Sequence, residues 1–241
     1  MKFANKKIKY IFSKGYFYKI NNKFIVCIED KYYLLNNISK VINNEIINIK
    51  YEKKRKNIYI FILGIISLIL MIVNFINYFN IKNNIYNLNY FLILFFMIVI
   101  TFIIHELGHI ITMLYYNKKP GKITPTMVYY LFPGIKVDVT KSLELTPFER
   151  INVNLGGVFF ASFLINVLYF YKFNINILNI LTLNTIMSVF PIYKSDGYNA
   201  ILSLFGIYEY KNKKNKLIFF VKILTTIVFV IYFILLFDIL K

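Results

Sequence analysis

The stretch TFIIHELGHIITMLYY, residues 101–116, places two histidines, a glutamate and a glycine inside an otherwise apolar run. His105 and His109 are four residues apart, so in a helix they lie on one face, about one turn from each other. A charged side chain such as Glu106 at the centre of a bilayer costs about 2.5–3.5 kcal/mol unless something compensates it. The stretch therefore predicts a buried helix whose polar groups have a partner.

A divalent cation is the partner that this pattern indicates. In HExxH, two imidazole nitrogens one turn apart share a metal ion, and the adjacent carboxylate takes the proton of a water molecule. His105 and His109 are the two histidines of the chain. The alternative is a chance match in which the histidines are hydrogen-bonded core residues. Polar and small residues gather on one helical face, which favours the metal site: Thr101, His105, Gly108, His109 and Thr112.

A catalytic zinc ion usually has three protein ligands and one open position. With no third histidine, and with Cys27 in the N-terminal segment, we expect the third ligand to be a carboxylate. The acidic residues in the N-terminal segment, in the polar linker and at the chain end can be set aside. Apart from Glu106, the acids that remain are Asp138, Glu209 and Asp196. Asp196 is the best candidate because it follows an apolar run and precedes a glycine that permits close backbone approach. The alternative is an exposed Asp-Gly turn.

The composition is that of a membrane protein. Of the 241 residues, 58% are hydrophobic and 19% are aromatic, more than a soluble core of this size requires. The net charge of +18 suits either nucleic acid or anionic lipid, and the apolar runs favour the lipid bilayer and exclude nucleic acid as the partner. Five runs reach roughly the 20 residues needed to cross a bilayer: 58–79, 88–116, 151–170, 175–193 and 217–240.

Charge also orients the chain. Residues 1–56 contain 14 Lys and Arg against 4 acidic residues, whereas the connections at 80–87 and 171–174 contain one lysine each. By the positive-inside rule, we expect a multi-pass protein of the cell membrane with its N-terminus in the cytoplasm. The basic segments 117–150 and 211–216 are then cytoplasmic as well.

Residues 1–56 precede the first run and form a separate basic segment, followed by a transmembrane domain at 57–241. Three stretches rich in aromatic and β-branched residues predict short strands, GYFYKI, KFIVCIE and KYYLLN, and ISKVINNEIINI predicts a small helix. Three roles are open for residues 1–56: packing on the membrane domain, binding a peptide, or anchoring the chain on anionic lipid.

A second β-rich stretch lies between the second and third runs. ITPTMVYY and GIKVDVT, joined by LFPG, predict a membrane-associated β-hairpin about a Pro-Gly turn. An exposed strand edge there could hold an unwound peptide by β-augmentation. The alternative is a hairpin that only shields the metal site.

These motifs together resemble the site-2 protease family of intramembrane zinc metalloproteases. The resemblance rests on HELGH in one apolar run and PIYKSDGYNAI after a later one, and it covers roughly residues 91–200. Within the family, the chain most resembles the branch of peptide zinc metalloproteases that is often found beside peptide-export systems. The resemblance implies an α-helical polytopic membrane protein that binds Zn²⁺ through His105, His109 and Asp196, with Glu106 as the general base.

The sequence departs from the family pattern at two places. Where many members have an asparagine three residues before the proline of the Asp-Gly motif, this chain has Ser188, with Asn184 one turn earlier. The Gly-Pro-x-x-Asn element appears as Gly157, Val158 and then Ala161. Since the family asparagine is thought to hold substrate, these departures concern substrate handling.

The sequence thus predicts a zinc metalloendopeptidase that cleaves a membrane-bound or membrane-associated peptide or protein. Peptide maturation or export fits the branch, and release of a membrane-tethered regulator fits the wider family. A non-catalytic metal-binding module and a metal or proton carrier are the other classes. The base-plus-ligand set favours the enzyme, because a structural zinc site needs no base and is normally closed by a fourth protein ligand.

Overall fold

The structure is a computed structural model that describes residues 6–12, 15–20, 23–28, 31–35, 48–53, 58–78, 88–128, 132–190 and 195–205, with single residues and short pieces between 219 and 234. The chain divides into two compact units. Unit 1 comprises Met1–Asn57 and Leu143–Thr146, and unit 2 comprises Ile58–Ser142 and Pro147–Lys241.

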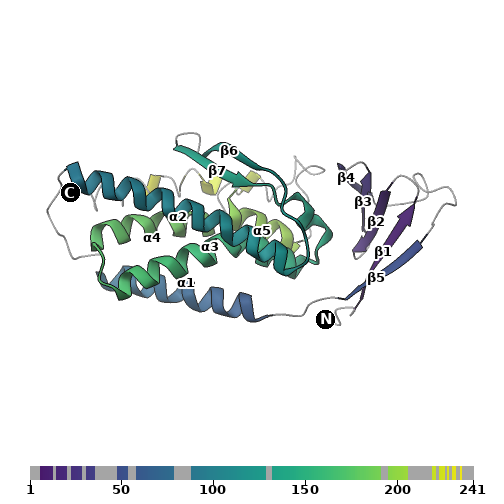
Figure 1. The fold of residues 1–241 in the computed structure, drawn as a ribbon, viewed down its shortest axis with the longest axis horizontal. Helices are drawn as coiled ribbons and strands as arrows, with labels where there is room; N and C mark the ends of the chain where they lie inside the picture. The colour runs from purple at the N-terminus through teal and green to yellow at the C-terminus, as the bar shows by residue number, and fades with distance from the viewer. Residues whose placement is uncertain are drawn as a thin grey trace. The chain divides into compact units, whose positions relative to one another are not determined.

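Unit 1 is a five-stranded antiparallel sheet in the order β4-β3-β2-β1-β5 (Figure 1). Its strands are β1 (Lys6–Phe12), β2 (Gly15–Ile20), β3 (Lys23–Ile28), β4 (Lys31–Leu35) and β5 (Asn48–Lys53). The small N-terminal β segment is therefore confirmed, with β2, β3 and β4 at the three predicted stretches. The strands β1 and β5 were not predicted, although KKIKYIF alternates lysines with apolar residues as a strand does. The predicted helix is wrong at its end, because Asn48 and Ile49 belong to β5; residues 38–47 lie outside the described part of the chain.

A short segment distant in sequence completes unit 1. Glu144 is buried and accepts hydrogen bonds from the hydroxyl groups of Tyr16, at 2.6 Å, and Tyr18, at 3.1 Å. Tyr18 is itself fully buried and pairs with Ile25 of the next strand, as Tyr16 pairs with Cys27. A buried carboxylate requires such donors, so the two phenols explain why Glu144 is tolerated inside the unit.

Unit 2 is helical. Its helices are α1 (Tyr59–Tyr78), α2 (Leu88–Tyr115), α3 (Pro147–Phe170), α4 (Ile175–Val189) and α5 (Asp196–Phe205), and a 3-10 helix, η1 (Thr140–Glu144), precedes α3 and runs into unit 1. Among the described residues, α1, α2 and α3 are long and apolar enough to cross a membrane. α4 has 15 residues and is about 22 Å long, shorter than a hydrocarbon core of about 30 Å. Most of the run at 217–240 lies outside the described residues, so five spans stay a prediction.

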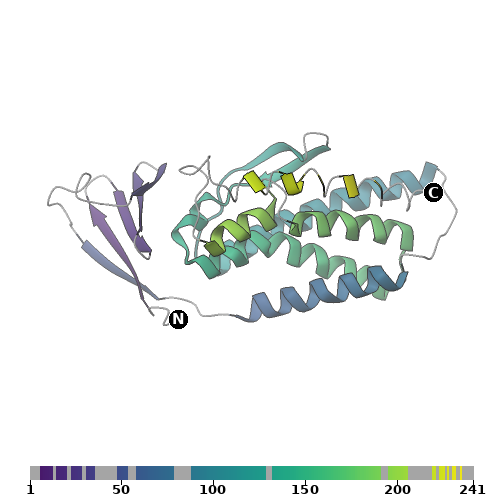
Figure 2. The ribbon, with the colours of Figure 1, turned by 180° about the vertical axis from the view of Figure 1, so that it is seen from behind.

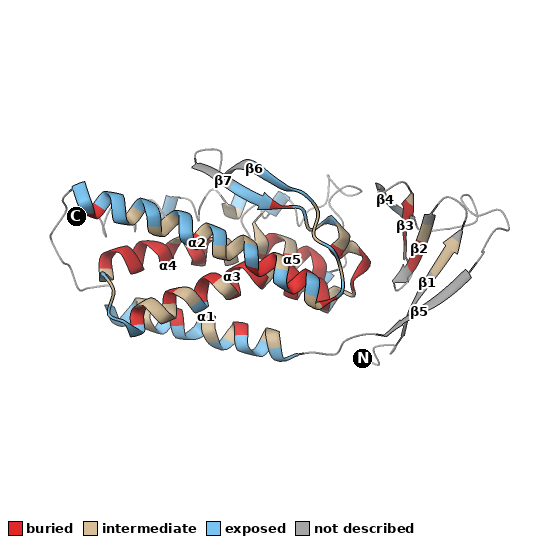
Figure 3. Cartoon of the chain, in the orientation of Figure 1, coloured by how far each residue is buried: buried red, intermediate tan, exposed pale blue. Residues whose placement is uncertain are grey.

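The helices of unit 2 divide into exposed and buried ones. In Figure 3, α1 and α2 carry mainly exposed and intermediate positions, whereas α4 and much of α3 are buried. Most of the exposed positions of α1 and α2 are apolar, Ile62, Leu63, Phe95 and Phe96 among them. Large apolar side chains facing outward along two helices suit a lipid environment. α3 and α4 run alongside each other in both views (Figures 1 and 2).

Glycines allow α2 and α3 to approach closely. A Cβ atom added to Gly108 would overlap the backbone of Gly156, and one added to Gly156 would lie 2.5 Å from the Thr112 hydroxyl. Small residues at such a crossing let two helices pack through their backbones, which is the usual way for helices to associate in lipid. This crossing places the His105–His109 turn of α2 directly against α3.

Polar side chains join α1 to α3. The Asn166 amide donates to the Ser67 carbonyl at 2.7 Å and accepts from Asn74 at 3.2 Å, while the Ser67 and Ser162 hydroxyls lie 3.0 Å apart. Interhelical hydrogen bonds of this kind hold helices together where lipid surrounds them. These asparagines therefore have a structural role that the Asn-rich composition alone does not indicate.

The stretch between α2 and α3 contains a β-hairpin. Its strands, β6 (Ile123–Val128) and β7 (Phe132–Val137), pair antiparallel. The predicted Pro-Gly turn is wrong, because Pro133 and Gly134 lie within β7, opposite Met127 and Thr126. Residues 129–131, which join the strands, lie outside the described part. A proline fits in a strand where its nitrogen faces away from the partner strand, since no hydrogen bond is lost there.

Candidate metal centre

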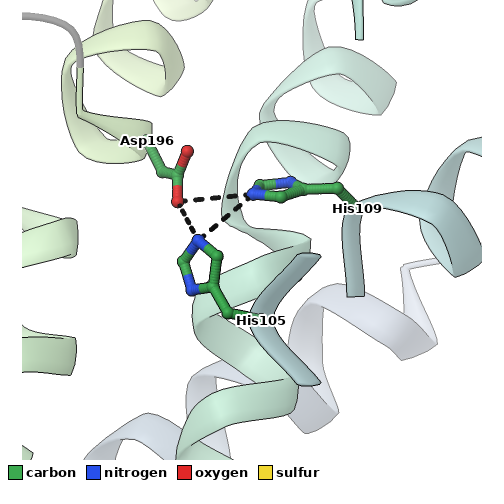
Figure 4. A group of neighbouring side chains, drawn as sticks. All are labelled: His105, His109 and Asp196. Carbon is green, nitrogen blue, oxygen red and sulfur yellow. Dashed lines mark hydrogen bonds and ion pairs between the residues drawn. The ribbon is translucent and has the colours of Figure 1, made fainter. Parts of the chain in front are cut away.

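Three side chains converge where α2 and the start of α5 both meet α3. The carboxylate oxygen Oδ2 of Asp196 lies 2.8 Å from Nε2 of His105 and 3.5 Å from Nε2 of His109, and the two nitrogens are 3.3 Å apart (Figure 4). The sequence proposed these three residues as ligands, and the structure brings them together from α2 and from the start of α5. Among the described residues they form a group able to hold a metal ion.

The start of α5 positions Asp196. The Ser195 hydroxyl donates to the Phe190 carbonyl at 2.7 Å and accepts from the Tyr198 amide at 3.1 Å, so Ser195 caps α5 and joins it to the end of α4. Gly197 lies so close to the Val189 carbonyl that any Cβ atom there would overlap it. Asp196, as the first residue of α5, is therefore held at a fixed distance from α4.

The donor set fits a zinc ion. Two ligands of a tetrahedral zinc at about 2.0–2.1 Å lie about 3.3 Å from each other, close to the separations of the three atoms here. Without a proton or a cation between them, the lone pairs of the two nitrogens and the carboxylate would oppose one another. The lack of a side chain at Gly157 leaves room for both imidazole rings, because a Cβ atom there would lie 2.6 Å from Nε2 of each histidine.

The backbone of α3 fixes the orientation of one imidazole. Nδ1 of His109 lies 2.8 Å from the Val153 carbonyl oxygen, and His109 is buried. Because a carbonyl can only accept, Nδ1 carries a proton, and Nε2 is the ring nitrogen left to face a metal ion. This arrangement, with a main-chain carbonyl behind a metal-facing histidine, is common in zinc sites.

The surroundings keep Asp196 ionised. Burial by itself would raise the pKa of its carboxyl group, but the neighbouring imidazoles of His109 and His105 outweigh burial and lower that pKa. The carboxylate is thus the charged form that binds a cation. Metal binding in such a cluster weakens as the imidazoles take up protons.

Glu106 stands outside the cluster of three. Its Oε2 accepts a hydrogen bond from the Val137 main-chain amide of β7 at 2.7 Å. In HExxH the glutamate is the base and not a ligand, so this separation from the cluster agrees with the proposed role. The role itself stays a prediction.

The other candidate ligands lie elsewhere or outside the described residues. Asp138 accepts from the amide and hydroxyl of Thr140 and so caps η1, and Glu209 lies outside the described part of the chain. Of the family departures, Ala161 is buried in α3, and the Ser188 hydroxyl donates to the Asn184 carbonyl at 3.4 Å within α4.

Comparison with known proteins gives a relative whose name states a metalloprotease chemistry. The chain is 26% identical over 206 residues to "Putative peptide zinc metalloprotease protein YydH" of Bacillus subtilis (strain 168), an alignment covering 80% of this chain and 82% of the relative. The predicted resemblance is confirmed. No family model and no solved structure match the chain. The similarity supports a metalloprotease function for this chain, and the name of the relative suggests zinc as the metal.

Sequence reasoning missed three groups around the site. Gly157 was considered only as a departure from a family element, and the Val153 carbonyl and Val137 amide are main-chain groups. Gly157 could have been found, because a Gly-Gly pair in an apolar helix indicates close approach of another chain segment. A main-chain donor or acceptor has no signature in the residue types, so the other two could not.

Proposed function

We propose that this protein is an intramembrane zinc endopeptidase that hydrolyses a peptide bond in a membrane-bound or membrane-associated precursor, in peptide maturation or export. The observation that carries the proposal is the convergence of His105, His109 and Asp196 over Gly157, with Glu106 on the same turn of α2. The peptide zinc metalloprotease named among the relatives supports it.

Each residue has a separate task in this reaction. His105, His109 and Asp196 hold the ion, which when bound supplies Lewis-acid chemistry by polarising the scissile carbonyl and acidifying water. Glu106 takes a proton as the water oxygen bonds to the carbonyl carbon. It then delivers that proton to the leaving nitrogen as the C–N bond breaks, giving a carboxylate and an amine. The Val153 carbonyl keeps the His109 ring oriented throughout.

The number of donors favours catalysis over a structural role. Structural zinc sites are usually closed by four protein ligands, whereas catalytic ones have three and an open position. Among the described histidine, cysteine, aspartate and glutamate residues, three form the group at this site. A non-catalytic module would also have no need for Glu106 beside the ligands.

The hairpin is a candidate for holding the substrate. A protease that acts on helical segments requires an extended peptide, since a helix covers its own carbonyl groups. Among the strands that the structure describes, β7 pairs with β6 on one edge, and its other edge faces the Glu106 turn of α2 through Val137. An unwound peptide could add to that edge as a further strand. The partners are then the precursor and the surrounding bilayer.

The proposed membrane arrangement has five spans with the N-terminus in the cytoplasm. Support comes from the three apolar helices α1, α2 and α3 and from the excess of basic residues before α1. Reporter fusions after residues 50 and 145 test it. Cytoplasmic reporters are expected at both points, and an active external alkaline phosphatase at either would contradict the arrangement.

Cleavage and metal content together test the function. The unmodified protein and the Glu106→Gln, Asp196→Ala and His105→Ala variants are purified in detergent, assayed on a library of single-span peptides by mass spectrometry, and analysed for zinc per chain. Glu106→Gln is expected to retain zinc and to lose nearly all cleavage, because it removes the base and preserves size. Asp196→Ala and His105→Ala are expected to lose zinc. Cleavage by Glu106→Gln at the unmodified rate would refute the proposal, and retained zinc in Asp196→Ala would place the third ligand elsewhere.

A further inference from the structure

The hydrogen bond between Glu106 and β7 joins the proposed base to a part of the chain outside the HExxH helix. Val137 is 2% exposed, although its neighbours Lys136 and Asp138 are exposed. The Val137 amide donates to Oε2 of Glu106 over 2.7 Å. A hydrogen bond from an amide to a carboxylate is charge-assisted, and shielding from water strengthens it.

The register of the hairpin shows why this amide is available. In an antiparallel pair, the amides of alternate residues point toward the partner strand and away from it. The Asp138 amide donates to the Lys122 carbonyl at 3.1 Å, and Gly121 donates back to Asp138 at 2.8 Å, so Asp138 faces β6. Val137, one residue earlier, therefore presents its amide on the opposite edge, toward α2.

One carboxylate oxygen is thus committed and the other is not. Among the residues that the structure describes, Oε1 of Glu106 receives no hydrogen bond, and Oε2 is held by Val137. A general base must present one oxygen to the attacking water at hydrogen-bond distance. The hydrogen bond to Oε2 restricts the rotation of the carboxylate and so limits where Oε1 can lie.

We propose that the main-chain amide of Val137 is a positioning group for Glu106, so that the β6–β7 hairpin is part of the catalytic apparatus and not only a cover or a substrate support. This inference rests on the proposed function, because it assigns a partner to the base of that reaction. A main-chain donor suits the task, since its place is set by strand pairing and not by a side-chain rotamer.

Proline substitution removes one amide and so tests the role in turnover. Val137→Pro deletes the donor on the edge of β7 that does not pair with β6, so the hydrogen bonds between β6 and β7 are retained. Val137→Ala retains the donor and controls for the loss of the side chain. Ile135→Pro, two residues along the same edge, controls for a proline in β7. Zinc per chain, kcat and KM are measured on a single-span peptide that the unmodified protein cleaves.

The expected result separates the three variants. Val137→Pro retains zinc and KM and loses about ten- to hundredfold in kcat, the usual cost of losing a group that orients an active-site residue. Val137→Ala and Ile135→Pro both retain the Val137 amide, so each is expected to keep at least about ten times the kcat of Val137→Pro. Equal kcat values for Val137→Pro and Val137→Ala would overturn the proposal, as would a loss of kcat in Ile135→Pro as large as that in Val137→Pro.

Amide hydrogen exchange in the zinc-free protein gives a readout that needs no activity. Replacing Glu106 by alanine is expected to speed exchange of the Val137 amide about ten- to hundredfold, the loss of one charge-assisted hydrogen bond. The Asp138 amide, which donates to Lys122, is the internal reference and should not change. Unchanged exchange at Val137 would refute the contact even if Val137→Pro failed to fold. Absence of cleavage by the unmodified protein would refute the proposed function, and the exchange result would still decide whether Val137 holds Glu106.

Discussion

Gly157 gives the sharpest test of how the metal centre is built. A Cβ atom at this position would lie 2.6 Å from Nε2 of both His105 and His109, whereas real Cβ atoms essentially never come nearer than 3.0 Å and ordinary contact begins at 3.4 Å. In Gly157→Ala, each nitrogen or the backbone of α3 must therefore move by about 0.4 to 0.8 Å. Since zinc–ligand distances tolerate only about ±0.2 Å, we expect zinc affinity to fall by at least about tenfold to hundredfold.

Competition with a chelator of known zinc affinity measures this loss on purified protein in detergent. Gly64→Ala is the matched control, because a Cβ atom there would overlap the Phe159 ring at the α1–α3 contact and not the metal centre. The control is expected to lower stability and to retain zinc affinity. If Gly157→Ala bound zinc as tightly as the unmodified protein, the two imidazoles could not face the ion across Gly157, and the proposed site would be wrong.

Two further predictions concern the stability of each unit. Asn166→Leu breaks the amide contacts between α3 and α1, and we expect it to lower the free energy of unfolding by about 0.6–2 kcal/mol in a detergent–lipid titration. Asn89→Leu, at an exposed position of α2, should leave the free energy of unfolding unchanged. An equal decrease in both variants would contradict the role of the Asn166 amide. Glu144→Ala removes the carboxylate that accepts hydrogen bonds from the Tyr16 and Tyr18 hydroxyls, and it should cost about 1.5–3 kcal/mol per bond, seen as faster amide exchange in β2 and β3. Glu144→Gln, which retains an acceptor, should lose less, and equal exchange in all three proteins would show that the carboxylate does not stabilise the unit.

The sequence by itself predicted what depends on local spacing. Four residues between His105 and His109 place both on one helical face in any helix, and apolar runs of sufficient length predict α1, α2 and α3. The three stretches at β2, β3 and β4 form strands for a similarly local reason, the abundance of aromatic and β-branched residues. Asp196 was selected by elimination and by resemblance, and the structure brings it within 2.8 Å of His105.

Only the tertiary structure decided which groups surround these side chains. Pro133 and Gly134 have the residue types of a turn, yet they lie in β7, because register and not composition decides which strand positions need an amide. The closeness of Gly157 to both imidazoles follows from the crossing of α2 with α3. The bonds from Val137 to Glu106 and from His109 to Val153 use main-chain atoms that every residue possesses. Such groups carry no signal in a sequence, so their partners are fixed only when distant segments pack together.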